Sequence, residues 1–284
     1  MSGAAEAPLS GADLQRLSAF LYRHTGMLFG ESKRYYIERR LADRLAATGH
    51  RDFAAYFGWL RADADERETL INAFTVNETY FYREAHQLAC LSRSLLPALI
   101  ETRRPGDRIR IWSAPCSTGE EAYSIAIWLL ENWRLVDAYN IEIIGSDIDT
   151  RVLAAARQGL YGGRALARLP RPVLDSYFEP AGPDRWRIIQ DLRESVAFTQ
   201  ANLIDARTLA QQGTFDVIFC RNLLIYFDDD SRLVAARHLH DRLAPGGYLC
   251  LGHTESMGRI SDRFVVRRFE DAIVHQRPEA GDVR

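Results

Sequence analysis

The sequence predicts an α/β protein in which a mostly parallel sheet, covered by helices on both faces, follows an all-α region. Two observations predict this fold class. Apolar side chains recur at helical spacing almost throughout residues 10–104. From Arg108 onward, short continuous apolar runs alternate with helical segments, a pattern typical of parallel strands that helices cover. The length of 284 residues suits one large domain or two unequal ones.

The helical region divides at glycines and at candidate caps. A first helix, "LQRLSAFLYRHTGM", is expected to stop at Gly26, and a second, "SKRYYIERRLADRLAATGH", to begin at Ser32 as N-cap and to end at Gly49. Two shorter helices, "FAAYFGWL" and "ERETLINAF", follow, and then a longer one, "EAHQLACLSRSLLPALIETRR". We expect an all-α domain over 1–76 and a connecting loop and helix over 77–108.

The rest of the chain, 109–284, is expected to form the sheet domain. Its strands are predicted at "IRIWSA", "IEIIGSD", "VAFTQAN", "FDVIFC" and "GYLCLG", with helices at 119–131, 150–158 and 229–243. The strands "FVVRRF" and "AIVHQR" have no helix between them, so the last part of the sheet is expected to be antiparallel. The run "RWRIIQDLRESVAF" reads as strand, turn and strand, a small β-hairpin in an insertion at about 177–200. The tail "RPEAGDVR" is expected to be unstructured.

Composition narrows the classes of partner and compartment. The net charge of −2 and the pI of about 6.4 provide no overall basic field for nucleic acid. The four cysteines are widely spaced and form no metal-binding pattern, so we expect reduced thiols and no metal. No secretion signal and no apolar run of about 20 residues is present. We therefore expect a cytoplasmic protein that is not inserted in a membrane. We also expect it to be a monomer.

The loop "SAPCSTG" joins the first strand to the helix that carries Glu120 and Glu121 in its first turn. In parallel sheets, ligands bind at such strand-to-helix junctions, and small residues there are expected to leave room for one. A phosphate-binding loop would need a lysine or a G-x-G-x-x-G run, whereas two carboxylates repel phosphate. The alternative is a tight turn whose glutamates only favour the positive end of the helix dipole.

The second strand favours a ligand. It ends in Asp147, in the place where an acid binds ribose hydroxyls, and is followed by Asp149, which is better placed as a helix cap. A loop of small residues, an acid after the next strand and no phosphate-binding residues together favour a nucleoside without phosphates. S-adenosylmethionine fits that description. The alternative is that both aspartates are only caps.

Five segments, in order, resemble the chemotaxis-receptor glutamate O-methyltransferases, the CheR family. They are "NETYFYREAH" at 77–86, "WSAPCSTGEEAYSIA" at 112–126, "GSDIDTRVLAAARQGLY" at 145–161, "FDVIFCRNLLIYFD" at 215–228 and "PGGYLCLGHTES" at 245–256. The resemblance implies a Rossmann-like S-adenosylmethionine-dependent methyltransferase that esterifies receptor glutamates and releases S-adenosylhomocysteine. It implies cofactor contacts by Asn77, Thr79, Arg83, Gly119, Glu120, Glu121, Asp147, Asn202, Leu203, Arg221, Asn222 and Leu223.

The resemblance also implies roles in the reaction. Tyr226 would lie near the methyl group and orient the incoming carboxylate, and Arg83 would pair with the cofactor's carboxylate. The alternatives without a functional role are that Tyr226 is an aromatic residue at the edge of the core and that Arg83 is a solvated charge. His253 and Glu255 are candidates to line the same crevice, with no assigned chemistry. A glutamate substrate is already ionised at neutral pH, so the reaction needs no general base.

The helix from Lys33 carries Arg39, Arg40 and Arg44. The resemblance implies that this face docks on the acidic helices of a receptor, while the alternative is an ordinary solvated face. The β-hairpin matches a family subdomain that in some members binds a receptor C-terminal peptide, or it is a plain insertion.

Two other functions stay open. One is an S-adenosylmethionine enzyme that acts on RNA or a small molecule, and the other is a cofactor-binding signalling module without activity. A nicotinamide dehydrogenase is disfavoured because no pyrophosphate-binding glycines are present.

Overall fold

The computed structural model describes residues 9–279, and the chain forms two compact units. Unit 1 contains the residues before 77 together with 226–231, and unit 2 contains 77–225 and the residues after 231. The last residues of the predicted unstructured tail, 280–284, lie outside the described residues.

Unit 1 is helical, as the sequence predicts. Its elements are α1 (Gly11–Thr25), η1 (Glu31–Lys33), α2 (Arg34–Thr48), α3 (Phe53–Leu60) and α4 (Ala64–Phe74). Gly26 and Gly49 end α1 and α2 in the left-handed conformation, as predicted. The prediction of Ser32 as an N-cap is wrong, because a short 3₁₀ turn covers that position and α2 begins at Arg34. The core of unit 1 consists of Leu14, Leu17, Phe20, Leu21, Ile37, Leu41, Leu45, Phe53, Tyr56, Phe57, Leu60, Leu70 and Phe74.

The segment 226–231 packs within unit 1 although it follows a strand of unit 2 in sequence. The backbone N–H of Leu28 donates to the carbonyl of Tyr226 at 3.2 Å, and Met27 forms a β-bridge with Phe227. The Tyr22 hydroxyl donates to the Asp228 carboxylate at 2.9 Å. The segment is therefore part of the helical unit's own packing.

Unit 2 is built on the predicted sheet. Its strands are β1 (Arg108–Ser113), β2 (Asn140–Asp147), β3 (Leu160–Gly162), β4 (Phe178–Pro180), β5 (Arg185–Ile188), β6 (Val196–Gln200), β7 (Phe215–Cys220), β8 (Leu243–Leu251), β9 (Val265–Arg268) and β10 (Ile273–Gln276). The remaining helical elements from residue 77 onward are α5 (Ala85–Cys90), the π-helical η2 (Leu91–Leu95), α6 (Leu96–Ile100), α7 (Glu120–Asn132), η3 (Val136–Ala138), α8 (Thr150–Gln158), α9 (Gly163–Leu166), α10 (Arg171–Tyr177), α11 (Gln190–Ser195), α12 (Ala206–Leu209), η4 (Leu224–Tyr226), α13 (Asp229–Arg242) and η5 (Met257–Arg259).

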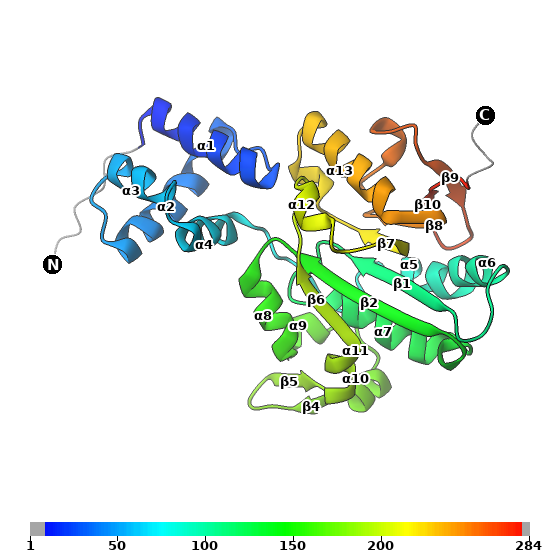
Figure 1. Ribbon diagram of the computed structural model, residues 1–284. Coiled ribbons are helices and arrows are strands. Elements are labelled where there is room, and N and C mark those ends of the chain that lie inside the picture. The colour runs from blue at the N-terminus through cyan, green and yellow to red at the C-terminus, as the bar shows by residue number, and fades with distance from the viewer. Residues whose placement is uncertain (1–8, 280–284) are drawn as a thin grey trace. The chain divides into compact units, whose positions relative to one another are not determined.

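The seven-stranded sheet has the order β6-β2-β1-β7-β8-β10-β9 (Figure 1). The chain runs outward from β1 through β2 to β6, and then returns to β7 on the other side of β1. The first five strands of this order pair in parallel, while β10 is antiparallel to β8 and to β9. The predicted fold class is confirmed, and the reversal places a topological switch point between β1 and β7.

The predicted pairing within 184–200 is wrong. Residues 190–195 form helix α11, and β6 joins the main sheet beside β2. The hairpin is made instead by β4 and β5, and β3 completes a small three-stranded sheet in the order β3-β5-β4. Leu192 of α11 is buried. Its apolar side chain belongs to the buried face of a short helix, although the sequence pattern had suggested a strand.

Candidate active site at the carboxyl edge of the sheet

Most of the predicted cofactor residues of unit 2 lie at one edge of the sheet. The loops that follow β1, β2, β6 and β7 leave the same edge, because these strands are parallel. Ligands of open α/β sheets bind at this edge, beside the switch point.

The loop after β1 is fixed to the strands on both sides of it. The N–H of Ala114 donates to the carbonyl of Phe219 in β7, and the N–H of Cys116 donates to the carbonyl of Ser146 in β2. Ser117 has a φ of 47°, which is uncommon for a residue with a side chain. Its N–H donates to Asp147 at 2.8 Å. The loop therefore has a defined path across the switch point.

Gly119 is needed for its backbone and for close packing. Its φ is 93°, and an added Cβ would lie 3.0 Å from the Cβ of Ala156 and 3.1 Å from the Phe198 ring. We expected space for a ligand at this glycine. On the side where a Cβ would stand, however, side chains of α8 and β6 fill that space. Contact between its backbone and a cofactor stays a prediction.

Asp147 is a buried acceptor at the end of β2. Its two carboxylate oxygens accept from the N–H of Ser117 at 2.8 Å and from the N–H of Asp149 at 3.0 Å. Burial raises the pKa of Asp147 to about 6, although both N–H groups oppose that rise. At neutral pH the group is ionised, and each oxygen has a further lone pair for a hydroxyl donor.

Asp149 is the cap of α8, as predicted. Its carboxylate accepts from the N–H of Arg151 at 2.9 Å. It also accepts from the Asn77 side-chain amide at 3.0 Å, while the Ser117 hydroxyl donates to the Asn77 carbonyl at 3.3 Å. The start of the connecting segment 77–84 is thus bound to the loops that follow β1 and β2.

Glu120 and Glu121 have different environments although they are neighbours on α7. Glu120 is buried and accepts from the Thr118 hydroxyl at 2.6 Å, and burial raises its pKa to about 7. Glu121 accepts from the Ser113 hydroxyl at 2.7 Å and from Arg221 at 2.8 Å. Burial raises the pKa of Glu121, with Arg221 opposing the rise. Glu121 therefore contacts the last residue of β1 and the residue that follows β7, on the two sides of the switch point.

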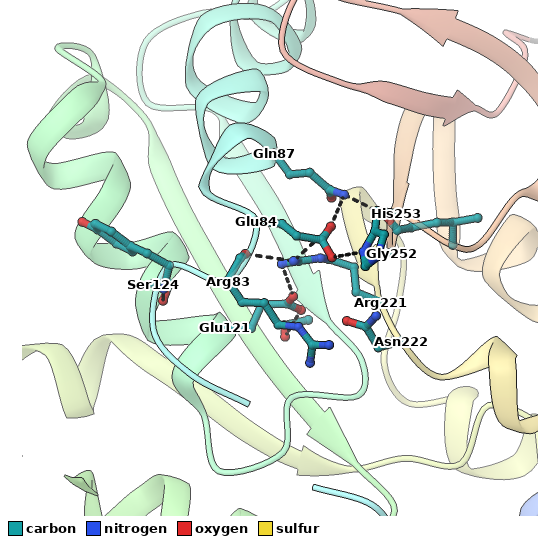
Figure 2. Close-up of polar contacts among 12 residues, drawn as sticks. Arg83, Glu84, Gln87, Glu121, Ser124, Arg221, Asn222, Gly252 and His253 are labelled. Atoms are coloured by element: carbon teal, nitrogen blue, oxygen red, sulfur yellow. Dashed lines mark hydrogen bonds and ion pairs between the residues drawn. The ribbon is translucent and has the colours of Figure 1, made fainter. Parts of the chain in front are cut away.

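Arg221 joins this edge to the connecting segment (Figure 2). Its guanidinium donates to Glu121 and, at 2.8 Å, to the carbonyl of Arg83, and it forms an ion pair with Glu84 at 3.2 Å. Burial favours a higher pKa for Glu84, but Arg221 and His253 hold the pKa of that carboxyl below its usual value. Gln87 donates to Glu84 at 2.9 Å and to the carbonyl of Leu251 at 2.7 Å.

Glu255 forms hydrogen bonds with the two loops that follow β7 and β8. One of its oxygens accepts from the N–H of Asn222 at 2.8 Å and from the N–H of Gly252 at 2.9 Å. Asn222 has a left-handed φ of 59°, which this pair of bonds helps to hold. The His253 ring is exposed and its Nδ1 lies 3.0 Å from Glu84. Glu255 thus bonds to both loops, and His253 contacts the connecting segment 77–84.

Four further predicted residues lie on the same loops or on the connecting segment. Leu203 is buried after β6, and the neighbouring Asn202 accepts from the N–H of Ile204 at 3.2 Å. Leu223 is half-buried after β7. Thr79 lines a cleft of about 670 Å³ within unit 2, together with Asn77, Glu78, Tyr80, Gly162, Arg164, Ala165, Ala167 and Arg168. The Arg83 guanidinium donates to the carbonyl of Glu78 at 3.0 Å.

The other predicted residues belong to unit 1. Tyr226 is half-buried in the segment 226–231. Arg44 forms a two-point ion pair with Glu66, at 2.8 and 2.5 Å, and Arg40 donates to the carbonyl of Ala73 at 2.5 Å with its guanidinium over the Tyr36 ring. Arg39 is exposed and has no ion-pair partner among residues 9–279. Of the three predicted docking arginines, Arg44 and Arg40 are engaged inside the unit.

Sequence reasoning missed Ser117, Glu84 and Gln87 as parts of the site. The serine lies in the loop that was singled out, and its role depends on a backbone conformation that no local pattern signals. Glu84 adjoins Arg83, but its partners Arg221 and His253 are more than 130 residues away in sequence.

The helices described within 9–279 are all too short or too polar to cross a bilayer. In the same residues, no cluster of three or more His, Cys, Asp or Glu side chains has the arrangement of a metal site.

Known families match almost the whole chain. Residues 12–75 match the CheR methyltransferase all-alpha domain, and residues 77–273 match the CheR methyltransferase SAM binding domain. The chain belongs to the CheR methyltransferase family. The predictions of the family, of S-adenosylmethionine as cofactor and of a methyltransferase are confirmed. The buried Asp147 and the largely enclosed Glu121, beside a loop without phosphate-binding residues, fit that cofactor's hydroxyl and ammonium groups.

Several curated relatives are similar over nearly their full length. Chemotaxis protein methyltransferase 2 of Vibrio cholerae is 46% identical, over 97% of this chain and 96% of the relative. Chemotaxis protein methyltransferase 2 of Pseudomonas aeruginosa is 39% identical, over 86% of each chain. The chemotaxis protein methyltransferase of Escherichia coli is 36% identical, over 91% of this chain and 89% of the relative.

Proposed function

We propose that the protein transfers a methyl group from S-adenosylmethionine to glutamate side chains on the cytoplasmic helices of a chemoreceptor, giving methyl esters. Membership of the CheR family and the chemotaxis methyltransferases among its relatives support this activity. The observation that carries the proposal within the structure is a pair of acids: Asp147 is buried at the end of β2, and Glu121, in the first turn of α7, accepts from Ser113 at the end of β1.

The cofactor supplies a methyl group on a positively charged sulfur. Asp147 would accept from ribose hydroxyls with the lone pairs that Ser117 and Asp149 leave unused. Glu121 would attract the ammonium group, and Arg83 the carboxylate, of the amino-acid portion. The remaining contacts proposed are those of Asn77, Thr79, Gly119, Glu120, Asn202, Leu203, Asn222 and Leu223.

Binding and alignment supply the catalysis. The substrate glutamate has an unperturbed pKa near 4.3 and needs no base at neutral pH. The protein has to hold the attacking oxygen in line with the transferred group and to exclude water. We assign to the Tyr226 hydroxyl the task of orienting that carboxylate.

The receptor partner is inferred from charge and from sheet edges. Arg39 on α2 offers an exposed cation to an acidic receptor helix, and the attraction would mainly speed encounter. In the small sheet β3-β5-β4, the outer strands β3 and β4 are where a receptor C-terminal peptide would add as a strand. We propose that the protein acts as a monomer in the cytoplasm.

The direct test is transfer of labelled methyl from S-adenosylmethionine to receptor cytoplasmic domains, with total RNA as the competing acceptor. Base-labile label on a receptor, with S-adenosylhomocysteine formed in equal amount, is the expected result. Label on RNA alone would establish the rival enzyme, and cofactor binding without transfer to any receptor would favour a non-enzymatic module.

Two variants separate binding from turnover. Asp147→Ala should weaken binding of S-adenosylhomocysteine by about 10- to 100-fold, because a ribose hydroxyl loses a charged acceptor worth about 1.5–3 kcal/mol. Tyr226→Phe should lower kcat while calorimetry gives an almost unchanged Kd. Unchanged affinity of Asp147→Ala would refute the assignment of the cofactor site.

A further inference from the structure

The Arg221 side chain is almost completely enclosed by protein. Only 3% of it is exposed, and its two terminal nitrogens contact Glu121, Glu84 and the carbonyl of Arg83 (Figure 2). A guanidinium presents its donors in a rigid plane, so three acceptors around it are fixed relative to one another. The sequence predicted Arg221 as a cofactor contact, but its terminal nitrogens face protein.

The three partners come from two separate parts of unit 2. Glu121 lies in the first turn of α7, while Arg83 and Glu84 belong to the connecting segment 77–84. Glu84 itself has a left-handed φ of 54°, and Tyr82 has a φ of 57°. Such conformations are unfavourable for residues with side chains and persist where the surroundings fix them. Arg221 supplies two of the fixing contacts, and the Ser124 hydroxyl accepts from the Tyr82 N–H at 3.0 Å.

Arg221 also neutralises the negative charges of Glu121 and Glu84. Glu121 and Glu84 face one guanidinium from two sides and are both largely buried. Without that cation two carboxylates would repel each other in a poorly hydrated site. Lysine would keep the charge, but its point-like ammonium cannot hold three acceptors in one plane.

We propose that Arg221 is a positioning residue, which holds the Glu121 carboxylate and the backbone at Arg83 in the places from which they bind S-adenosylmethionine. This inference rests on the proposed function. Arg221 acts on the cofactor only through these two neighbours. Its loss should therefore raise KM for the cofactor more than it lowers kcat at saturation.

The test compares Arg221→Gln and Arg221→Lys with the wild type. Calorimetry with S-adenosylhomocysteine should give a Kd about 10- to 100-fold weaker for Arg221→Gln, the range expected for losing hydrogen bonds to charged groups. Arg221→Lys should recover part of that affinity. KM for S-adenosylmethionine should rise in parallel with Kd in the receptor methylation assay, with a smaller change in kcat.

Arg103→Gln is the matched control. Arg103 also pairs with a buried carboxylate, that of Asp216, and also donates to a backbone carbonyl, but at the amino end of the sheet strands. Its loss should lower Tm and leave the affinity for S-adenosylhomocysteine unchanged, which separates lost stability from lost positioning. Glu84→Gln keeps the contact between Arg221 and Glu121 and should weaken binding less than Arg221→Gln.

The outcomes distinguish the two proposals. A wild-type protein that binds no S-adenosylhomocysteine overturns the proposed function. Normal wild-type binding with unchanged Kd in Arg221→Lys overturns only the positioning role, and this variant decides the question if Arg221→Gln does not fold. An equal loss of affinity in Arg103→Gln would likewise overturn it.

Discussion

Asp147 and Glu120 are both buried acids in unit 2, and burial raises the pKa of each. Asp147 accepts from two backbone N–H groups, whereas Glu120 accepts from the Thr118 hydroxyl. Burial brings the pKa of Asp147 to about 6 and that of Glu120 to about 7. Most of that difference comes from the higher ordinary pKa of a glutamate carboxyl, and it leaves Glu120 close to half-protonated at neutral pH.

Glu120 should therefore make stability depend on pH. Its folded pKa is raised above its unfolded value, so its contribution to stability is present at low pH and is lost as the pH rises to about 7. Glu120→Gln removes the charge and keeps an acceptor for Thr118. Relative to wild type, the variant should gain about 2.5 kcal/mol in free energy of unfolding between pH 5 and pH 8. Urea unfolding at both pH values measures this change.

The same difference between variant and wild type at pH 5 and at pH 8 would show that Glu120 does not titrate in this range. Asp149→Asn is a useful comparison, because that residue caps α8 and also contacts Asn77. Asparagine caps a helix about as well as aspartate, so we expect the effect of this variant to be the same at both pH values.

Single residues were predictable where a local rule applies. Capping preferences separated Asp149 from Asp147, and the structure has Asp149 as the cap. The enclosure of Arg221 could not be predicted in this way, because it depends on contacts with Glu84 and Glu121. Both glutamates lie at least 100 residues earlier in the chain. No spacing in the sequence reports such a meeting.

At the scale of elements, the loop after β1 depends on a tight contact between β2 and β6. An added Cβ at Gly145 would lie 2.7 Å from the Phe198 ring and 3.1 Å from the Cβ of Cys116. Phe198 in turn packs against the Tyr123 ring of α7, with centroids 5.4 Å apart. The glycine thus lets an aromatic side chain fit beneath the loop.

Gly145→Ala should disturb this packing. The buried ring cannot move without displacing its neighbours, so we expect a loss of about 1–3 kcal/mol in free energy of unfolding. Binding of S-adenosylhomocysteine should weaken as well, because Cys116 lies in the loop. Urea unfolding and calorimetry measure the two effects.

Gly58→Ala is the contrasting substitution. Gly58 lies in α3 with open space around its Cβ position, and alanine in a helix is favoured over glycine by about 0.5–1 kcal/mol. Stability should therefore rise and binding should stay the same. Equal effects of the two substitutions would contradict the packing argument.

Whole elements with strong periodicity were predictable, and short ones were not. The five parallel strands and α7, α8 and α13 appear close to their predicted bounds. The pairing of β5 was mispredicted because its partners, β3 and β4, are strands of three residues that carry almost no alternating pattern. Strand pairing is a non-local property, which a stretch such as 184–200 does not contain.

For the molecule as a whole, each unit has its own core, and unit 1 carries the charges that we propose for receptor docking. Segment 226–231 joins the packing of unit 1 and contains Tyr226. Division at residue 76 alone would separate Tyr22 from Asp228 and Met27 from Phe227. The helical unit therefore includes residues distant in sequence that periodicity alone does not assign to it.

Two arginines on α2 should behave differently in the complete protein. Arg39 is exposed, so Arg39→Glu should leave stability and cofactor affinity almost unchanged and lower kcat/KM for the receptor by about 2- to 5-fold at low salt. Screening should reduce this deficit as ionic strength rises. Arg44→Gln leaves the buried Glu66 unpaired and should cost about 3 kcal/mol in free energy of unfolding. Methylation rates from low to high salt, with urea unfolding of both variants, measure the contrast. A deficit in Arg39→Glu that persists at high salt would show that charge attraction is not what α2 contributes to docking.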